Sequence, residues 1–223
     1  MKAMILAAGR GKRMRPLTDH LPKPLIEVGG ETLIGRHLRQ LAEAGIEDVV
    51  INLAYLGDQI RAALGDGSDF GARLRYTLEP EGALETGGGI YHALDFLRGG
   101  PFLVVNGDIW TDFPFDRLPR DIAPGGHLVL VPNPSHNQRG DCDLSGDQVT
   151  IPGNRSLTFS GMGVYPASLF KNCRPGRFPL WPVIAGAASR DGVSGERYDG
   201  VWFDVGAPDQ LAALRQFLAR SAI

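Results

Sequence analysis

Hydrophobic residues follow two kinds of pattern, in turn, along the first half of the chain. Short strand-like runs are separated by segments whose apolar residues recur every three or four positions. The runs predict strands at Ala3–Ala7, Asp48–Leu53, Arg73–Leu78 and Phe102–Val105. The spaced segments predict helices at Glu31–Ala44, Leu56–Leu64 and Thr86–Leu97.

Repeated strand-helix-strand units predict an α/β fold with a mostly parallel sheet and helices on both faces. Ligands of such sheets bind beyond the carboxyl ends of the strands. The loops that follow Ala7, Leu78 and Val105 are therefore the expected site, and all three carry glycine and charged residues.

After about Gly125 the pattern changes to short extended segments with turn residues between them. Leu128–Val131, Gln148–Ile151 and Leu157–Tyr165 predict antiparallel strands that add a pocket wall. A last amphipathic helix, Pro208–Arg220, is expected to pack across the sheet.

Length and charge narrow the class of protein. The chain has 223 residues and is 43% apolar, which suits one domain, 1–223. Its net charge of -2 argues against nucleic acid as a partner, so any phosphate binding is expected to be local. The apolar run at the N-terminus is too short for a signal peptide or a membrane span, which predicts a cytoplasmic protein. Cys142 and Cys173 have no metal-ligand spacing, and buried free thiols are expected.

The loop after the first predicted strand reads "AAGRGKRMRPLTDHLPKPL". Gly9 and Gly11 allow its backbone N–H groups to turn inward, and basic residues surround them, which is typical of a triphosphate cradle. The spacing fits neither a P-loop nor a dinucleotide fingerprint. A solvated basic loop is the alternative. Lys23, between two prolines, is expected to lie in an extended segment and to act on a transferring phosphoryl group.

A glycine-rich segment, "EPEGALETGGG", follows the third predicted strand. Glu79 is placed to accept a hydrogen bond from uracil or guanine, and Gly82 with Gly87–Gly89 would let the backbone approach a base. A glycine-rich turn that caps the next helix is the alternative interpretation.

Two aspartates from distant segments are candidate metal ligands. Asp108 ends the "VNGD" strand and Asp204 lies in "WFDVGAP". Two carboxylates together with substrate oxygens suit Mg²⁺. The Asp-x-Asp pair Asp141 and Asp143 would instead suggest a metal-dependent glycosyltransferase, but it follows no clear buried strand.

In order, "LAAGRGKRM", "KPL", "GALETGGGI", "VNGD" and "WFDVGAP" resemble the motifs of the sugar-1-phosphate nucleotidylyltransferases. The resemblance spans nearly the whole chain. It implies a Rossmann-like, three-layer fold with a mixed sheet and a small antiparallel extension on the sugar side. It also implies a mainly nucleotide-binding half, 1–110, and a mainly sugar-binding half, 111–223. The implied reaction is Mg²⁺-dependent transfer of a nucleoside monophosphate to a sugar 1-phosphate, with release of pyrophosphate.

The same resemblance assigns roles to individual residues. The expected nucleotide contacts are Gly9, Gly11, Lys12, Arg13, Lys23, Glu79 and Gly82, with Arg13 and Lys23 as the catalytic pair. Asp108 and Asp204 match metal ligands, and Asn106, Gly140 and Asn154 are assigned to the sugar side. Many relatives carry a Glu-Lys-Pro motif that is absent here, and Arg155 is a candidate replacement for its lysine.

The resemblance is strongest to short bacterial members that use UTP and N-acetylmuramate 1-phosphate in cell-wall recycling. Arg139, Arg155 and Arg197 are candidates to bind the lactyl carboxylate of that sugar. A guanylyltransferase acting on mannose or heptose 1-phosphate, and a non-catalytic nucleotide-sugar sensor, remain alternatives.

Overall fold

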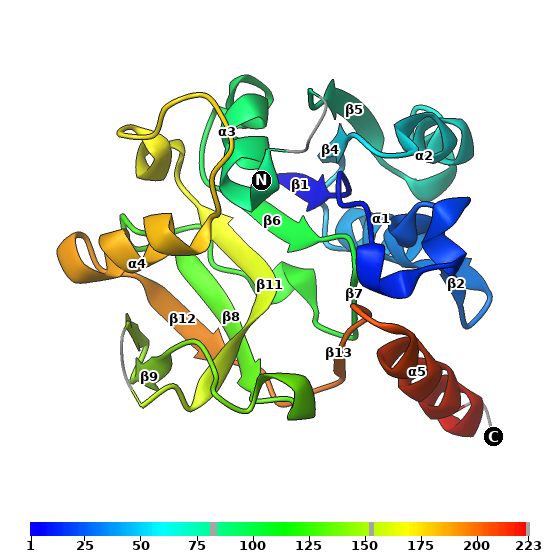
Figure 1. Cartoon of the computed structure of the whole chain (residues 1–223). Helices are drawn as coiled ribbons and strands as arrows, with labels where there is room; N and C mark the ends of the chain where they lie inside the picture. The colour runs from blue at the N-terminus through cyan, green and yellow to red at the C-terminus, as the bar shows by residue number, and fades with distance from the viewer. Residues whose placement is uncertain (81–83, 152–153, 222–223) are drawn as a thin grey trace.

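The first half of the chain forms four adjacent parallel strands, as a computed structural model shows (Figure 1). The structure describes residues 1–80, 84–151 and 154–221. The strands are β1 (Lys2–Leu6), β4 (Asp48–Leu53), β5 (Arg73–Leu78) and β6 (Phe102–Asn106). They lie in the order β5-β4-β1-β6, and every pairing among them is parallel. The βα pattern of the first half therefore predicted its parallel strands correctly.

The second half continues the same sheet. Its strands are β8 (His127–Pro132), β9 (Asp143–Ser145), β10 (Gln148–Thr150), β11 (Leu157–Tyr165) and β12 (Ser194–Arg197). β11 lies between β6 and β8 and is antiparallel to both, whereas β12 is parallel to β8. The β9–β10 hairpin ends the sheet. The sheet is therefore mixed and mostly parallel, as expected.

Helices cover both faces of the sheet. On one face lie α1 (Leu33–Glu43) and α2 (Gly57–Leu64); on the other lie α3 (Glu85–Leu97) and α4 (Trp181–Arg190). Alternate residues of β1 serve the two cores: Ala3 and Ile5 face α1, while Met4 faces α3. Burial on both faces explains why this strand has an unbroken apolar sequence.

Several elements were not predicted from sequence. Pro182 and Gly186 interrupt the apolar pattern of α4, and β12 contains charged residues. Two further short sheets pair β2 (Glu27–Val28) with β3 (Glu31–Thr32), and β7 (Ile109–Thr111) with β13 (Trp202–Asp204). Strands of two or three residues are too short to show a period.

The C-terminal helix α5 (Pro208–Ser221) forms where the sequence predicts it, but it does not pack across the large sheet. Leu211 and Leu214 instead join a separate apolar cluster with Trp110 of β7 and Val205. Residues of the N-terminal loop, of β2 and of the start of α1 complete this cluster: Met14, Ile26, Val28 and Leu33. The helix follows β13 directly, so it remains beside that strand (Figure 1).

Both cysteines are free; Cys142 is buried, as expected, and Cys173 is partly exposed. Burial raises the pKa of the Cys142 thiol to about 12. This thiol therefore stays protonated and packs as a small apolar group. Within the described ranges, no helix is both long and apolar enough to cross a membrane.

Candidate active site

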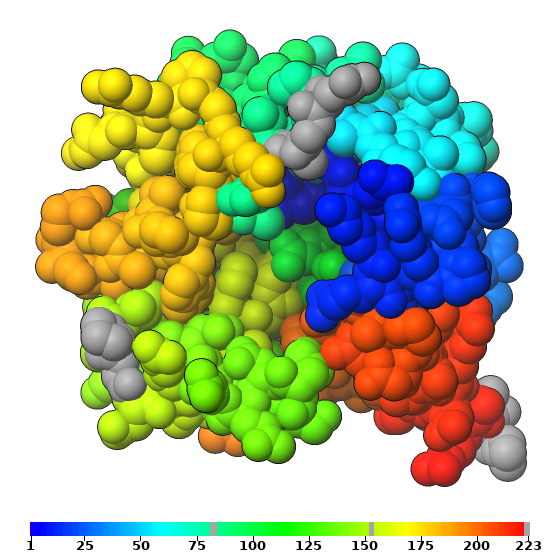
Figure 2. All heavy atoms as spheres, in the orientation of Figure 1, coloured from blue at the N-terminus to red at the C-terminus, as the bar shows by residue number. Residues whose placement is uncertain are grey.

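A cleft opens at the carboxyl ends of the parallel strands. Leu6 of β1, Asn52 of β4, Glu79 after β5 and Asn106 of β6 all line it. Figure 2 shows this face hollowed between the blue N-terminal loop and the yellow and orange segments that include α4. The cleft therefore lies at the carboxyl ends of the strands, where a ligand site is expected.

The N-terminal loop forms one side of the cleft. Gly11 has φ +63°, a left-handed conformation that favours glycine, and its carbonyl accepts bonds from Met14 N–H (2.9 Å) and Thr18 Oγ1 (2.8 Å). Gly9 lines the cleft, and a Cβ there would meet nothing within 4 Å. The loop is thus tightly folded at Gly11 and open to a ligand at Gly9.

The basic residues of this loop divide into two groups. Arg10 lies over the Tyr55 ring at 5.1 Å, and Arg15 pairs with Asp19 at 3.0 Å. Lys12 and Arg13 are exposed and have no hydrogen-bond partner in the part of the chain that the structure describes. These two cations are therefore the ones available to a phosphate.

Lys23 lies at the centre of the site. Its Nζ donates to Oδ2 of Asp108 at 2.6 Å, and the lysine side chain is 9% exposed. The expectation of an extended segment holds at Pro22 but is wrong beyond it, because Lys23–Leu25 form a 3-10 turn in which Leu25 N–H donates to Pro22. The turn carries the lysine inward to the end of β6.

Two-stranded pairing brings the predicted metal ligands together. Asp204 ends β13 opposite Ile109, and Val205 N–H donates to the carbonyl of Asp108 at 2.8 Å. Burial raises the pKa of Asp204, and the nearby negative charge of Asp108 raises it further. The positive charges of Lys23 and Arg13 partly offset this shift. A cation beside Asp204 would stabilise its ionised carboxylate, which burial and the charge of Asp108 disfavour.

The donor set fits Mg²⁺, which binds carboxylate oxygen and takes its remaining ligands from substrate and water. In the described ranges, no group of three or more His, Cys, Asp or Glu side chains converges as a metal cage. Asp108 and Asp204 therefore suit an ion shared with a phosphate substrate better than a closed structural site.

A buried polar network fixes the opposite wall of the cleft. Asn52 accepts a bond from Ala7 N–H (2.8 Å) and donates to Glu79 Oε1 (2.6 Å), while Glu79 Oε2 accepts from Leu84 N–H (2.7 Å). Glu79 is thus in the predicted place, but both its oxygens already bind the protein. Sequence reasoning missed Asn52, whose signal is a lone amide near the end of the apolar run "DVVINL".

The glycine run serves the fold rather than an open surface. A Cβ at Gly87 would lie 2.5 Å from the Phe178 ring, and one at Gly88 would lie 2.3 Å from Gly176 O. Gly89 packs in the same way against Glu79. The interpretation of these three glycines as a base platform is therefore wrong, because distant parts of the chain occupy the space beside them. Gly82 lies outside the described residues.

The predicted sugar-side residues are not equally placed. Asn106 lines the cleft, and its amide has no hydrogen-bond partner in the described ranges. Gly140 is buried with φ +59°, and Arg155 O and Asn133 fill the space at its Cα, so it shapes a turn instead of facing the cleft. Asn154 is exposed in the loop before β11.

Asp141 and Asp143 brace that part of the chain. Asp141 accepts from Phe159 N–H at 2.9 Å, and Asp143 accepts from Ser156 N–H at 2.9 Å. The Ser156 hydroxyl and N–H hold the pKa of Asp143 below its usual range. Both oxygens of each carboxylate accept hydrogen bonds from the protein, which argues against the Asp-x-Asp metal site of a glycosyltransferase.

His136 was not predicted. Its Nε2 lies 3.5 Å from Oδ2 of Asp204, and its ring stacks on Trp202 with centroids 6.5 Å apart. Trp202 Nε1–H donates to Ser160 O at 2.9 Å, which ties this pair to β11. A histidine in a polar loop gives no sequence signal, because only the fold places it beside Asp204.

The sequence of this chain is similar to a known family and to several known enzymes. The family described as "Nucleotidyl transferase" matches residues 2–140. An N-acetylmuramate alpha-1-phosphate uridylyltransferase from Neisseria meningitidis is 51% identical over 95% of this chain and 95% of its own length. A mannose-1-phosphate guanyltransferase from Emericella nidulans is 31% identical over 93% of this chain and 61% of its own length.

The fold is shared with more distant proteins. A Bacillus anthracis protein crystallised with sucrose, which carries the provisional name glucose-1-phosphate thymidylyltransferase, superposes with a TM-score of 0.86. The match covers 98% of this chain and 95% of that one at 20% identity. With the carboxylate pair and Lys23 gathered at the strand ends, these similarities place the chain in the nucleotidyl transferase family, among the sugar-1-phosphate nucleotidyltransferases.

Proposed function

We propose that this protein transfers UMP from UTP to N-acetylmuramate 1-phosphate, giving UDP-N-acetylmuramate and pyrophosphate. The observation that carries the proposal is the meeting of Lys23 and Asp108 at the cleft, with Asp204 held beside them by the β7–β13 pairing. The uridylyltransferase relative, which aligns with nearly the whole chain, supports the choice of base and sugar. Such a reaction would serve the reuse of cell-wall sugar in the cytoplasm.

The chemistry needs alignment more than proton transfer. A phosphate monoester has a second pKa of about 6, so the sugar phosphate is largely dianionic at neutral pH and needs no general base. One of its oxygens forms a bond to the α-phosphorus of UTP, and the bond from that phosphorus to the bridging oxygen breaks. Pyrophosphate leaves with the electron pair of that bond. Holding the two phosphates in line can supply several kcal/mol, roughly 7–11 in favourable systems.

The residues of the cleft oppose the repulsion between the two anionic substrates. Lys23 is buried and held at a fixed position by Asp108, so its charge acts in a poorly solvated site. Arg13 is free to meet the triphosphate. Asp108 and Asp204 would hold Mg²⁺, which when bound neutralises charge on phosphate oxygens.

Further contacts are proposed for each part of the two substrates. Gly9, Gly11 and Lys12 are proposed for the triphosphate, and Glu79 with Gly82 for the uracil. Asn106 and Asn154 are proposed for the sugar phosphate, with Gly140 shaping the loop. For the lactyl carboxylate, Arg139 and Arg155 are better candidates than Arg197. Arg197 pairs with Asp199 at 2.7 Å, whereas the side chains of the other two have no partner among the described residues.

A guanylyltransferase acting on mannose 1-phosphate is the second candidate. Glu79 would serve guanine as well as uracil, and the guanyltransferase relative aligns with most of the chain. A non-catalytic sensor is disfavoured, because it would have no use for a buried lysine beside two carboxylates.

Pyrophosphate release with Mg²⁺ tests the proposal. UTP, GTP and dTTP should be crossed with the 1-phosphates of N-acetylmuramate, N-acetylglucosamine, glucose and mannose. We expect the highest kcat/KM with UTP and N-acetylmuramate 1-phosphate. A preference for GTP with mannose 1-phosphate would select the second candidate, and release with no pair would support the sensor.

A further inference from the structure

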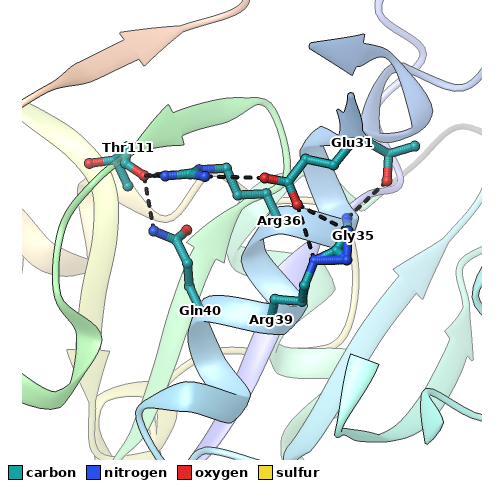
Figure 3. Close-up of polar contacts among 7 residues, drawn as sticks. Glu31, Gly35, Arg36, Arg39, Gln40 and Thr111 are labelled. Carbon is teal, nitrogen blue, oxygen red and sulfur yellow. Dashed lines mark hydrogen bonds and ion pairs between the residues drawn. The ribbon is translucent and has the colours of Figure 1, made fainter. Parts of the chain in front are cut away.

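Helix α1 directs two polar side chains at strand β7, outside the cleft. Nε and Nη2 of Arg36 donate to the carbonyl of Thr111 at 3.3 and 3.2 Å, and Nε2 of Gln40 donates to it at 3.1 Å. Figure 3 shows the guanidinium of Arg36 lying between Thr111 and Glu31. Three N–H groups thus share one backbone oxygen, which is more than ordinary helix packing requires.

Both ends of the guanidinium are fixed. Nη1 of Arg36 pairs with Glu31 at 3.1 Å, and the guanidinium carbon lies 4.3 Å from the centroid of the Trp110 ring. The cation is therefore held in one plane by an ion pair on one side and an aromatic face on the other. In the described part of the chain β7 pairs with β13 alone, so α1 supports the side of β7 that has no strand neighbour.

Strand β7 is also the element that joins the two carboxylates. It begins directly after Asp108, and its partner β13 ends at Asp204. Thr111 lies opposite Trp202, and its hydroxyl donates to the carbonyl of Val201 at 2.8 Å. Because the ladder has three residue pairs, fixing Thr111 at one end fixes the spacing of the carboxylates at the other.

We propose that Arg36 and Gln40 are positioning residues that hold the β7–β13 pair so that Asp108 and Asp204 can share one divalent cation with the nucleotide. This inference rests on the proposed function. Neither residue lines the cleft, so their effect would reach the reaction through the placement of the carboxylates.

Calorimetry on the intact protein without sugar phosphate separates this role from general destabilisation. The dissociation constant of UTP is measured in EDTA and again with saturating Mn²⁺. The value in EDTA divided by the value with Mn²⁺ gives the contribution of the metal to UTP binding. We expect a ratio above about 10 for the unmodified protein. Arg36→Ala and Gln40→Ala should lower it at least fivefold, while the dissociation constant in EDTA changes less than twofold. Arg36→Lys should restore part of the loss.

Arg39→Ala is the matched control. Arg39 lies on the same helix and pairs with the same Glu31 at 3.1 Å, but it makes no bond to Thr111. Its ratio should stay within twofold of the unmodified value, and circular dichroism should show each variant folded at the assay temperature. If Arg36→Ala does not fold, Gln40→Ala decides the question.

Unchanged ratios in folded variants at both positions would overturn the inference while leaving the proposed reaction intact. A ratio near one in the unmodified protein would instead remove the shared metal site, and the inference with it.

Discussion

At the residue scale, the pair formed by Lys23 and Asp108 is unequal in exposure. The lysine side chain is 9% exposed and the aspartate side chain 34%. Lys23 is therefore held away from water, whereas Asp108 keeps part of its carboxylate open to the cleft. This arrangement suits a cation that acts on a bound phosphate and a carboxylate that also takes a ligand.

Replacing Lys23 by alanine should harm turnover far more than folding. Removal of one charge-stabilising donor typically lowers kcat about 100- to 1,000-fold. The partner left behind is partly solvated, so the melting temperature should fall by no more than about 4 °C. Steady-state kinetics and thermal unfolding on the same sample check this. Comparable losses of activity and stability would remove the catalytic role.

His37 gives the fold a sensitivity to acid. Burial lowers its pKa from 6.5 to about 4, and the backbone of Ile109 offsets only part of this shift. Between these values the unfolded chain binds the proton more tightly than the folded one. The free energy of unfolding is therefore unaffected by His37 above about pH 6.5, and it decreases as the pH falls from there towards 4.

The free energy of unfolding should fall by about 2 kcal/mol between pH 7 and pH 5 from this histidine alone. In His37→Leu the decrease over the same interval should be smaller by that amount. Urea unfolding of both proteins at the two pH values measures it. Parallel decreases would show that His37 does not titrate as described.

At the element scale, Asn52 joins the ends of three strands. Its amide links Ala7 after β1 to Glu79 after β5, and both bonds are buried. Asn52→Ala would leave a buried N–H and a carboxylate oxygen each without a partner. We expect the free energy of unfolding to drop by about 1–3 kcal/mol. The KM for UTP should rise about tenfold, because the nucleotide wall loses its support.

Thr77→Val is the control for that change. Thr77 lies opposite Asn52 in the β4–β5 ladder, and its hydroxyl has no partner among the described residues. Its replacement should leave the KM for UTP within twofold and the stability within about 1 kcal/mol. Equal effects of the two substitutions would mean that the Asn52 network does not support the site.

Predictability from sequence differed between elements for physical reasons. β4, β5 and β11 have the predicted bounds, because continuous or alternating apolar residues mark a strand wherever it pairs. The glycines of α3 were misread because the segment that packs on them, Gly176–Phe178, lies far away in sequence. α4 was missed because proline and glycine interrupt its pattern.

At the scale of the whole molecule, the site depends on long-range pairing. Their motifs marked Lys23, Asp108 and Asp204 as expected functional residues. Only the fold shows that Lys23 binds Asp108 and that the β7–β13 ladder brings Asp204 beside them. The same holds for His136, which reaches Asp204 from the loop after β8. Local sequence indicates the chemistry of such residues, whereas tertiary structure determines their neighbours.

Asp204 connects function to the stability of the whole chain. Burial and the charge of Asp108 raise its pKa above the value in an unfolded chain. Its ionised form is therefore disfavoured by the fold. The cost is present in full above the folded pKa and is lost as the pH falls from that value to the unfolded pKa. A group that costs stability when charged is expected at a site that binds a cation.

The role of Asp204 in the reaction is measured with Asp204→Asn, by following UMP transfer to N-acetylmuramate 1-phosphate and thermal unfolding on one preparation. The substitution keeps the shape of the side chain and removes its charge. We expect kcat/KM to fall at least about 100-fold while the melting temperature without ligands stays the same or rises. Activity within threefold of the unmodified protein, in a folded variant, would contradict the assignment of Asp204 to the reaction centre.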